Sequence, residues 1–238
     1  MNFLLITKAL KRVSTPEKAK FYPTFFKTQP GEYGEGDVFI GVSVPDIRAV
    51  AKKFLDTPYP EIEALLYSEI HEHRTCGLFI LVGNFQRGGE KARHQIFRFY
   101  VKHMKQVNNW DLVDLSAPAI VGGMLWESKD FTTLDTWARS QNLWKRRIAI
   151  VSTLYLIRKE HFAPTLRISK LLLSDSQDLI HKAVGWMLRE AGKKEFAVVQ
   201  TFVDQHGPDM PRTMLRYAIE RFPKEMRLHY LKKTRNSP

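Results

Sequence analysis

The spacing of apolar residues along the chain predicts helices almost throughout. Apolar side chains recur every three or four positions, whereas the alternation typical of β-strands is scarce. Short turns rich in proline, glycine, asparagine or aspartate separate the helices, and residues 232–238 are expected to be frayed. The predicted helices are Phe3–Val13, Pro16–Lys27, Ser43–Phe54, Tyr59–Ile70, His71–Val82, Lys91–Val107, Trp110–Leu115, Pro118–Trp126, Phe131–Ser140, Leu143–Glu160, Pro164–Leu173, Asp178–Ala191, Lys194–His206, Pro211–Arg221 and Pro223–Lys232.

A polar residue recurs near the start of five of these helices, at Arg74, Asp111, Arg147, Lys182 and Arg216. The successive steps are 37, 36, 35 and 34 residues. A period of this length, made of two helices, is typical of HEAT-class repeats, which stack and present their inner helices on a concave face. Coincidence among helices of uniform length is the alternative, but the spacing and the local pattern recur together. We therefore predict an all-α superhelical fold of HEAT-like helical hairpins, forming a single domain over residues 1–238.

The charge balance favours a polyanionic partner. The chain carries 37 lysine and arginine residues against 25 aspartate and glutamate residues, a formal net charge of +12. An excess of this size favours association with nucleic acid and makes the predicted concave groove basic. A generically basic soluble protein remains the alternative on charge alone.

Several functional classes are disfavoured. The single cysteine, Cys76, allows no disulfide within the chain and no cysteine-based zinc site. His71 and His73 are two residues apart and face different sides of a helix, so they cannot chelate a metal together. The glycine-rich segment Gly31–Asp37 lacks the Lys-Ser/Thr ending and the preceding strand of a phosphate-binding loop. We therefore expect no metal and no cofactor.

The location of the protein is predicted from what the sequence lacks. The N-terminal segment has no positive leader followed by a cleavage site, and no run approaches the roughly 18 apolar residues of a membrane span. We expect a cytoplasmic protein without a membrane partner, associated with the nucleoid if the host is a bacterium. A monomer is the default expectation.

Tryptophan residues beside charged residues mark the candidate site. Trp110 and Asp114 are four residues apart, so they lie on one face of a short helix. Asp111, in the first turn, is expected to cap that helix and complement its dipole. Asp114 lies too late in the helix for that role, and a salt bridge to Arg147 of the next repeat would keep it ionised and oriented.

Two later helices carry matching cations. Of the adjacent pair Arg146 and Arg147, Arg147 agrees better with the phase of the repeat. Lys182, Trp186 and Arg189 form one face of the following helix. Alternating cations and aromatic rings suit contacts with phosphates and sugars, although Trp186 taken alone would be assigned to the core.

At these residues the chain resembles the AlkD-like family of DNA alkylation-repair glycosylases, over nearly its whole length. The motifs that carry the resemblance are Trp110-Asp-Leu-Val-Asp114, Trp144-Lys-Arg-Arg147 and Lys182-Ala-Val-Gly-Trp186. The resemblance implies HEAT-like repeats that wrap duplex DNA. It also implies removal of cationic bases, such as 3-alkyladenine and 7-alkylguanine, without base flipping.

The same resemblance implies roles for individual residues. Asp114 would be the catalytic carboxylate, Trp110 and Trp186 would cradle the backbone and deoxyribose of the lesion, and Arg147 would pair with the aspartate or a phosphate. The remaining positions expected to bind the DNA are Lys182, Arg146, Arg189, Arg74, Arg216 and Phe25. Two departures stand out: Phe25-Phe26 replaces a tyrosine near the end of the second helix, which removes a hydroxyl contact, and the Gly31–Gly36 loop is longer.

The predicted activity is thus a DNA glycosylase acting on alkylated purines in double-stranded DNA during base excision repair. Two other readings stay open. A non-catalytic HEAT-like module that binds DNA or RNA would keep the basic groove but would need no carboxylate there. A protein-interaction solenoid would have a mixed groove and no affinity for DNA, which the charge and the Trp/Asp/Arg pattern disfavour.

Overall fold

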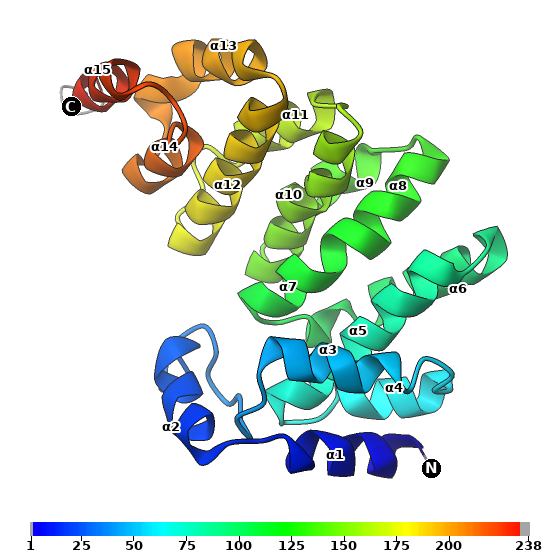
Figure 1. The fold of residues 1–238 in the computed structure, drawn as a ribbon. Helices are drawn as coiled ribbons and strands as arrows, with labels where there is room; N and C mark the ends of the chain where they lie inside the picture. Colours follow the sequence, from blue (N-terminus) through cyan, green and yellow to red (C-terminus); the bar gives the residue numbers. More distant parts are fainter. Residues whose placement is uncertain (1, 234–238) are drawn as a thin grey trace. The chain divides into compact units, whose positions relative to one another are not determined.

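Helices make up the architecture, and most are joined by short turns, although a long loop over residues 26–43 connects α2 to α3 (Figure 1). The computed structural model describes residues 2–233. Within this part of the chain no strand forms, and the only β-type pairing is an isolated bridge between Val38 and Ile70. The predicted all-α class is therefore confirmed. Residues 234–238 of the C-terminal tail, which was expected to be frayed, lie outside the described part.

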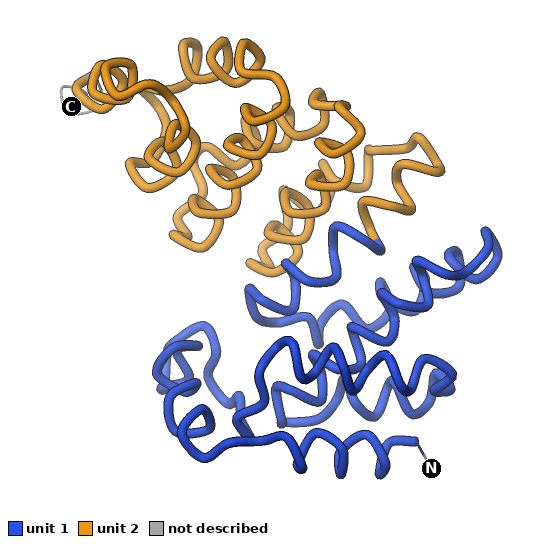
Figure 2. The backbone as a smooth tube through the Cα atoms, in the orientation of Figure 1, with its two compact units in different colours: residues 1–120 blue, residues 121–238 orange. Residues whose placement is uncertain are grey.

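The chain divides into two compact units, residues 1–120 and 121–238 (Figure 2). The boundary falls inside a five-residue π-helical turn, η2 (Pro118–Gly122). The grouping of both units into one domain remains a prediction from the sequence.

Unit 1 is built around α5 (His71–Arg87). Five other helices of the unit pack on it, and every residue from His71 to Leu81 is buried. The elements of this unit are α1 (Asn2–Arg12), α2 (Pro16–Phe25), α3 (Val44–Lys52), α4 (Tyr59–Leu66), α5, α6 (Glu90–Lys102), η1 (Met104–Gln106) and α7 (Trp110–Ala117). Because α5 is covered on all sides, it carries polar residues that must find partners inside the unit.

Unit 2 consists of helices that pack in an alternating order. α10 packs on α12 and α12 on α14, while α9 and α11 contact α10, and α11 and α13 contact α12. This order agrees with stacked two-helix repeats. The elements are α8 (Gly123–Ser128), α9 (Thr132–Ala138), α10 (Leu143–Arg158), α11 (Ala163–Leu171), α12 (Asp178–Lys194), α13 (Phe196–His206), η3 (Gly207–Asp209), α14 (Arg212–Ala218) and α15 (Lys224–Lys233).

One glycine sets the approach of α12 to α14. A Cβ atom at Gly185 would lie 2.4 Å from the Cβ of Tyr217 and 2.5 Å from the carbonyl oxygen of Met214. No side chain fits at that distance, so glycine is required if the two helices are to pack this closely. The glycine of the Lys182–Trp186 motif thus has a packing role.

Asparagine residues cap two of the three helices that carry the tryptophan motifs. The side chain of Asn109 accepts a hydrogen bond from the backbone N–H of Trp110 at 2.8 Å. Asn142 accepts from the N–H groups of Trp144 and Lys145 at 2.9 and 3.0 Å. Such caps satisfy backbone donors at a helix start and contribute about 1 kcal/mol each. The expectation that Asp111 caps α7 is wrong, because Asn109 holds that position.

None of the helices in residues 2–233 is long and apolar enough to cross a membrane. The described residues also include no group of three or more histidine, cysteine, aspartate or glutamate side chains placed to hold a metal ion. Cys76 is fully buried, and burial raises the pKa of its thiol to about 12, which disfavours it as a nucleophile.

Candidate functional site

Trp110 and Asp114 lie on one face of α7 in unit 1. The helix begins at Trp110, so the pair spans its first turn, and both residues are half-buried. Leu112, Val113 and Ser116 occupy the buried side of the same helix. The arrangement leaves an indole and a carboxylate as neighbours on the less buried side of α7, as the four-residue spacing predicts.

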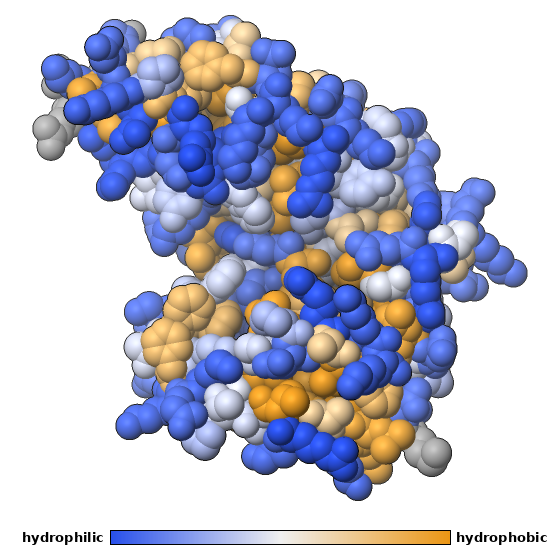
Figure 3. Space-filling model, in the orientation of Figure 1, coloured by the Kyte–Doolittle hydropathy of each residue, from blue (hydrophilic) through white to orange (hydrophobic). Residues whose placement is uncertain are grey.

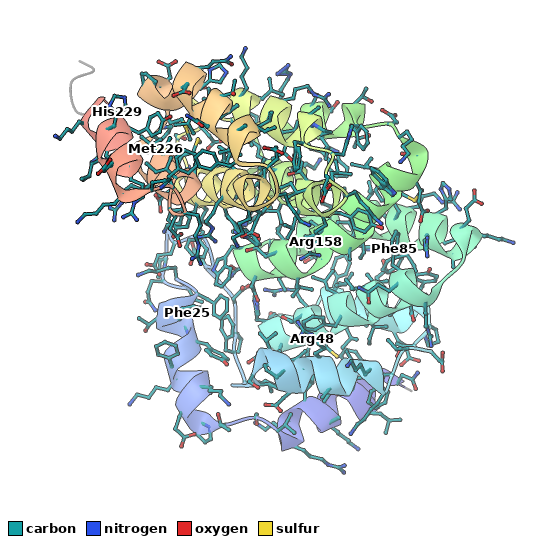
Figure 4. All side chains as sticks on the ribbon, turned by 45° about the horizontal axis from the view of Figure 1, so that its top comes forward. Phe25, Arg48, Phe85, Arg158, Met226 and His229 are labelled. Atoms are coloured by element: carbon teal, nitrogen blue, oxygen red, sulfur yellow. The ribbon has the colours of Figure 1, made fainter. Side chains whose placement is uncertain are left out.

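An aromatic cluster holds the indole of Trp110. The ring of Phe26 stacks on it at a centroid distance of 5.4 Å, and the ring of Phe25 meets it edge-on at 5.9 Å. The ring of Phe39 stacks in turn on Phe26, with a centroid distance of 4.8 Å. Phe25, labelled on α2 in Figure 4, is 48% exposed. Phe25 and Phe26 therefore act as ring contacts of Trp110.

A buried ionic network fixes the start of α7. The imidazole of His71 lies between two carboxylates, with Nδ1 2.9 Å from Asp37 and Nε2 2.8 Å from Asp111. Asp37 also receives hydrogen bonds from Arg74 at 2.5 Å and from the amide of Asn109 at 3.2 Å. The network thereby ties the glycine-rich loop, the first turn of α5 and the first turn of α7 together.

The charges of this network follow from its contacts. Burial alone would lower the pKa of His71, but the charge of Asp111 and the hydrogen bonds to Asp111 and Asp37 outweigh it and raise the pKa to about 9. Burial would raise the pKa of Asp37, but His71 and Arg74 together lower it. At neutral pH the network therefore contains an imidazolium and a guanidinium paired with two carboxylates.

The glycine-rich loop is held by two of its own acidic side chains. Glu32 accepts from the N–H of Gln29 at 2.9 Å, and Glu35 accepts from the N–H of Gly31 at 2.8 Å. The loop lies so close to the end of α2 that a Cβ atom at Gly34 would be 2.4 Å from the carbonyl oxygen of Phe26. This close approach allows the loop to place Asp37 in contact with His71 and Arg74.

In unit 2, the two adjacent arginines of α10 have different surroundings. Arg147 is 5% exposed and donates to the carbonyl oxygen of Leu179 at 2.6 Å, next to the start of α12. Arg146 is half-buried and donates to Asp175 at 2.6 Å and to two carbonyl oxygens of residues 140–141 at 3.0 Å. Both guanidinium groups therefore have hydrogen-bond partners within the unit.

The cations of α12 and α14 are more exposed. Lys182 forms an ion pair with Asp178 at 2.7 Å, with side chains 43% and 57% exposed. Arg189 pairs with Glu220, and Trp186 is half-buried on the same helix. Arg216 is exposed on α14. The Lys182–Asp178 pair is of the surface kind, and its partners can be exchanged at little cost.

Of the predicted site residues, the structure brings Trp110, Asp114 and Phe25 together in unit 1, and Lys182, Trp186 and Arg189 onto one helix in unit 2. Arg74 is 4% exposed and bonded to Asp37 and to the carbonyl oxygen of Ser68, so we assign it a structural role and no longer propose it as a contact with DNA. His71, Asp37 and Phe39 were not predicted as site residues. The only signal for His71 and Asp37 was that ionisable residues interrupt the apolar pattern of α5 and the loop before it, and Phe39 had no signal of its own.

Comparisons with known proteins agree with one another. Residues 6–222 match the family model described as DNA alkylation repair enzyme. A solved structure described as a predicted DNA alkylation repair enzyme from Enterococcus faecalis superposes with a TM-score of 0.69 at 21% sequence identity. The match covers 89% of this chain and 97% of that one, which at this identity shows a shared fold. No curated protein matches the chain.

Proposed function

Because the chain belongs to the DNA alkylation repair enzyme family, we propose that it is a DNA glycosylase for alkylated purines that carry a positive charge, such as 3-alkyladenine and 7-alkylguanine in duplex DNA. The observation that carries the proposal is the pairing of Trp110 and Asp114 on one face of α7, at a helix start fixed by a buried ionic network. In this proposal the alkylated base stays in the duplex while its glycosidic bond is hydrolysed.

The chemistry suits the residues. Alkylation at a ring nitrogen makes the purine cationic, so the base leaves as a neutral molecule and needs little help from a general acid. Positive charge then develops on the deoxyribose, and an oxocarbenium-like state of this kind requires a carboxylate nearby. Asp114 supplies that carboxylate and orients the attacking water.

Aromatic and cationic residues support the reaction. The indole of Trp110 faces the developing charge and contributes about 0.5–2 kcal/mol of cation–π stabilisation. We assign the same kind of contact with the deoxyribose and backbone to Trp186. Lys182, Arg146, Arg189 and Arg216 hold phosphates of the DNA. Arg147, which is buried and donates to the carbonyl oxygen of Leu179, positions the start of α12 that carries Lys182 and Trp186. Phe25 packs against Trp110 and contacts the DNA through its exposed edge.

The test is release of free base from alkylated DNA by the purified full-length chain. Duplex DNA treated with a methylating agent is incubated with the protein, and 7-methylguanine and 3-methyladenine are quantified by chromatography. We expect release by the wild type and a loss on the order of 10²–10³-fold for Asp114→Asn, the magnitude seen when one group that stabilises developing charge is removed. Binding to undamaged DNA should be nearly unchanged.

A matched control separates the role of Asp114 from a general effect of lost charge. Asp56→Asn makes the same substitution in the same unit at a side chain that is 95% exposed, and should retain full activity. Full base release by Asp114→Asn would refute the mechanism. Salt-sensitive DNA binding by a wild type that releases no base would instead favour the non-catalytic binding module.

A further inference from the structure

Unit 1 contains a cavity of about 240 Å³ beside Trp110, and the proposed glycosylase mechanism uses none of its polar residues. Five aromatic side chains line it, from α2, the loop after the glycine-rich segment, and α7: Tyr22, Phe25, Phe26, Phe39 and Trp110. Asp114 does not line it. On the face shown in Figure 3, apolar side chains are exposed over α2, where Phe21 and Phe25 are 57% and 48% exposed. The cavity therefore has an aromatic wall whose rim reaches the solvent.

The polar residues of the cavity give it a negative charge. Glu72, Asp111 and His71 line one side, so two carboxylates face one imidazolium. Asp37 and Arg74, which lie behind His71, neutralise each other. The cavity thus carries a net charge of about −1 in a chain whose net charge is +12. Local charge of this sign attracts a cation.

The carboxylates of Glu72 and Asp111 differ in how many hydrogen bonds they already accept from the protein. Glu72 accepts hydrogen bonds from the backbone N–H groups of three successive residues, 40–42, at 2.8–3.2 Å, so its hydrogen-bonding capacity is used by the protein. Asp111 is different. Its Oδ2 atom accepts from His71, while Oδ1 is buried and has no hydrogen-bond partner among the described residues. A buried carboxylate oxygen without a donor is costly, and a donor brought by a ligand would remove that cost.

From these features we infer that the cavity is a binding site for a planar aromatic cation that carries an N–H donor. The aromatic side chains attract the cationic ring, as in other aromatic cages. The N–H group donates to Oδ1 of Asp111, and the cation cancels the net negative charge. The volume admits a group of one or two fused rings. Aryl amidiniums, aminopyridiniums and cationic aminopurines belong to this class.

The experiment uses a pair of probes that differ in charge and not in shape. Benzamidine is a planar cation with N–H donors at neutral pH, and benzamide is its neutral counterpart. Both are titrated into the full-length protein by calorimetry. We expect benzamidine to bind at least about ten-fold more tightly than benzamide, which corresponds to about 1.4 kcal/mol. Equal affinities, or no benzamidine binding up to about 10 mM, would overturn the proposal.

Two variants assign the binding to the cavity. Asp111→Asn keeps an acceptor for His71 but removes the charge, and should bring the ratio of the two affinities close to one. Phe25→Ala removes a half-exposed ring from the rim and should weaken benzamidine binding by roughly 3- to 30-fold, the range of a single cation–π contact. Phe21→Ala is the matched control, because Phe21 is an exposed ring of the same helix that does not line the cavity.

The outcomes of these variants are decisive in both directions. If Asp111→Asn fails to fold, the Phe25→Ala and Phe21→Ala pair still decides the question, since equal effects of the two would contradict a site in the cavity. Asp114→Asn should bind benzamidine like the wild type. That variant separates this inference from the proposed function, because base release depends on Asp114 and cation binding does not.

Discussion

The two units hold their functional side chains in opposite ways. In unit 1, Trp110 and Asp114 are on a helix whose start is fixed by buried charges, with side chains of His71 and Asp37 only 3% and 5% exposed. In unit 2, the cations beside Trp186 are held by ion pairs near the surface, such as that of Lys182. Buried pairs are costly to break, whereas exposed pairs contribute little. The start of α7 in unit 1 is thus organised for fixed geometry, and the Lys182 face of α12 in unit 2 for exchangeable contacts.

The largest expected effect is that of His71→Ala on stability. The substitution removes the imidazolium between Asp37 and Asp111 and leaves Asp111 buried without a counter-charge. Breaking a buried pair in this way costs about 3–5 kcal/mol. The free energy of unfolding is measured by urea denaturation of both proteins.

A surface pair of unit 2 provides the control. Lys193→Ala removes an ion pair with Glu190 on α12, whose side chains are 43% and 22% exposed, and should cost less than about 1 kcal/mol. If the two substitutions changed the free energy of unfolding equally, the contrast between the units would not hold.

A somewhat smaller loss of folding stability is expected when the pH is raised. The folded-state pKa of His71, about 9, lies above its ordinary value of 6.5. The imidazolium therefore contributes stability in full below pH of about 6.5, and this contribution is lost as the pH rises through about 9. A shift of this size corresponds to a loss on the order of 3 kcal/mol. Chemical denaturation at a series of pH values measures it.

The variant His71→Gln tests whether this imidazole is responsible. Glutamine has only one donor group for the two carboxylates, so the variant should be less stable at neutral pH. Because glutamine does not titrate, the variant should also lose the decline in stability between pH of about 6.5 and 9. His73 gives no competing transition in that range, because burial lowers its pKa to about 4. A decline of the same size in His71→Gln would assign the effect to another group.

Much of the architecture was predictable from periodicity. The apolar spacing located nearly every helix, because each one buries a stripe of side chains at a regular interval. The starts of α7 and α10 could also be predicted from the sequence. Asn109 and Asn142 stand one and two positions before Trp110 and Trp144, and asparagine is a favoured cap. Long-range contacts between side chains could not be predicted from the sequence. His71 meets Asp111 across 40 positions and Asp37 across 34, and no local pattern encodes such a contact.

Arg74 illustrates the limit of the repeat argument. Its spacing to Asp111 and Arg147 placed it correctly near the start of a helix, but phase in a repeat does not determine exposure. α5 is covered by five helices, so a polar residue at its start turns inward and pairs with Asp37. The corresponding residue of α14, Arg216, lies in the last turn of a helix with fewer neighbours and remains exposed. The difference lies in the packing around each helix, which a single sequence does not reveal.

The smallest expected effect concerns the salt dependence of DNA binding, where Arg216 is the sharpest probe in unit 2. A guanidinium that contacts one phosphate releases about one counterion, so Arg216→Ala should reduce the slope of log affinity against log salt concentration by about one. Arg87→Ala is the control in unit 1, because Arg87 is exposed, pairs with Asp56 and ends α5 away from the predicted inner positions. Fluorescence anisotropy with duplex DNA at several salt concentrations gives both slopes. An equal reduction in both variants would mean that positive charge acts as a diffuse attraction over the whole surface, and the specific role of the α12 and α14 cations would have to be abandoned.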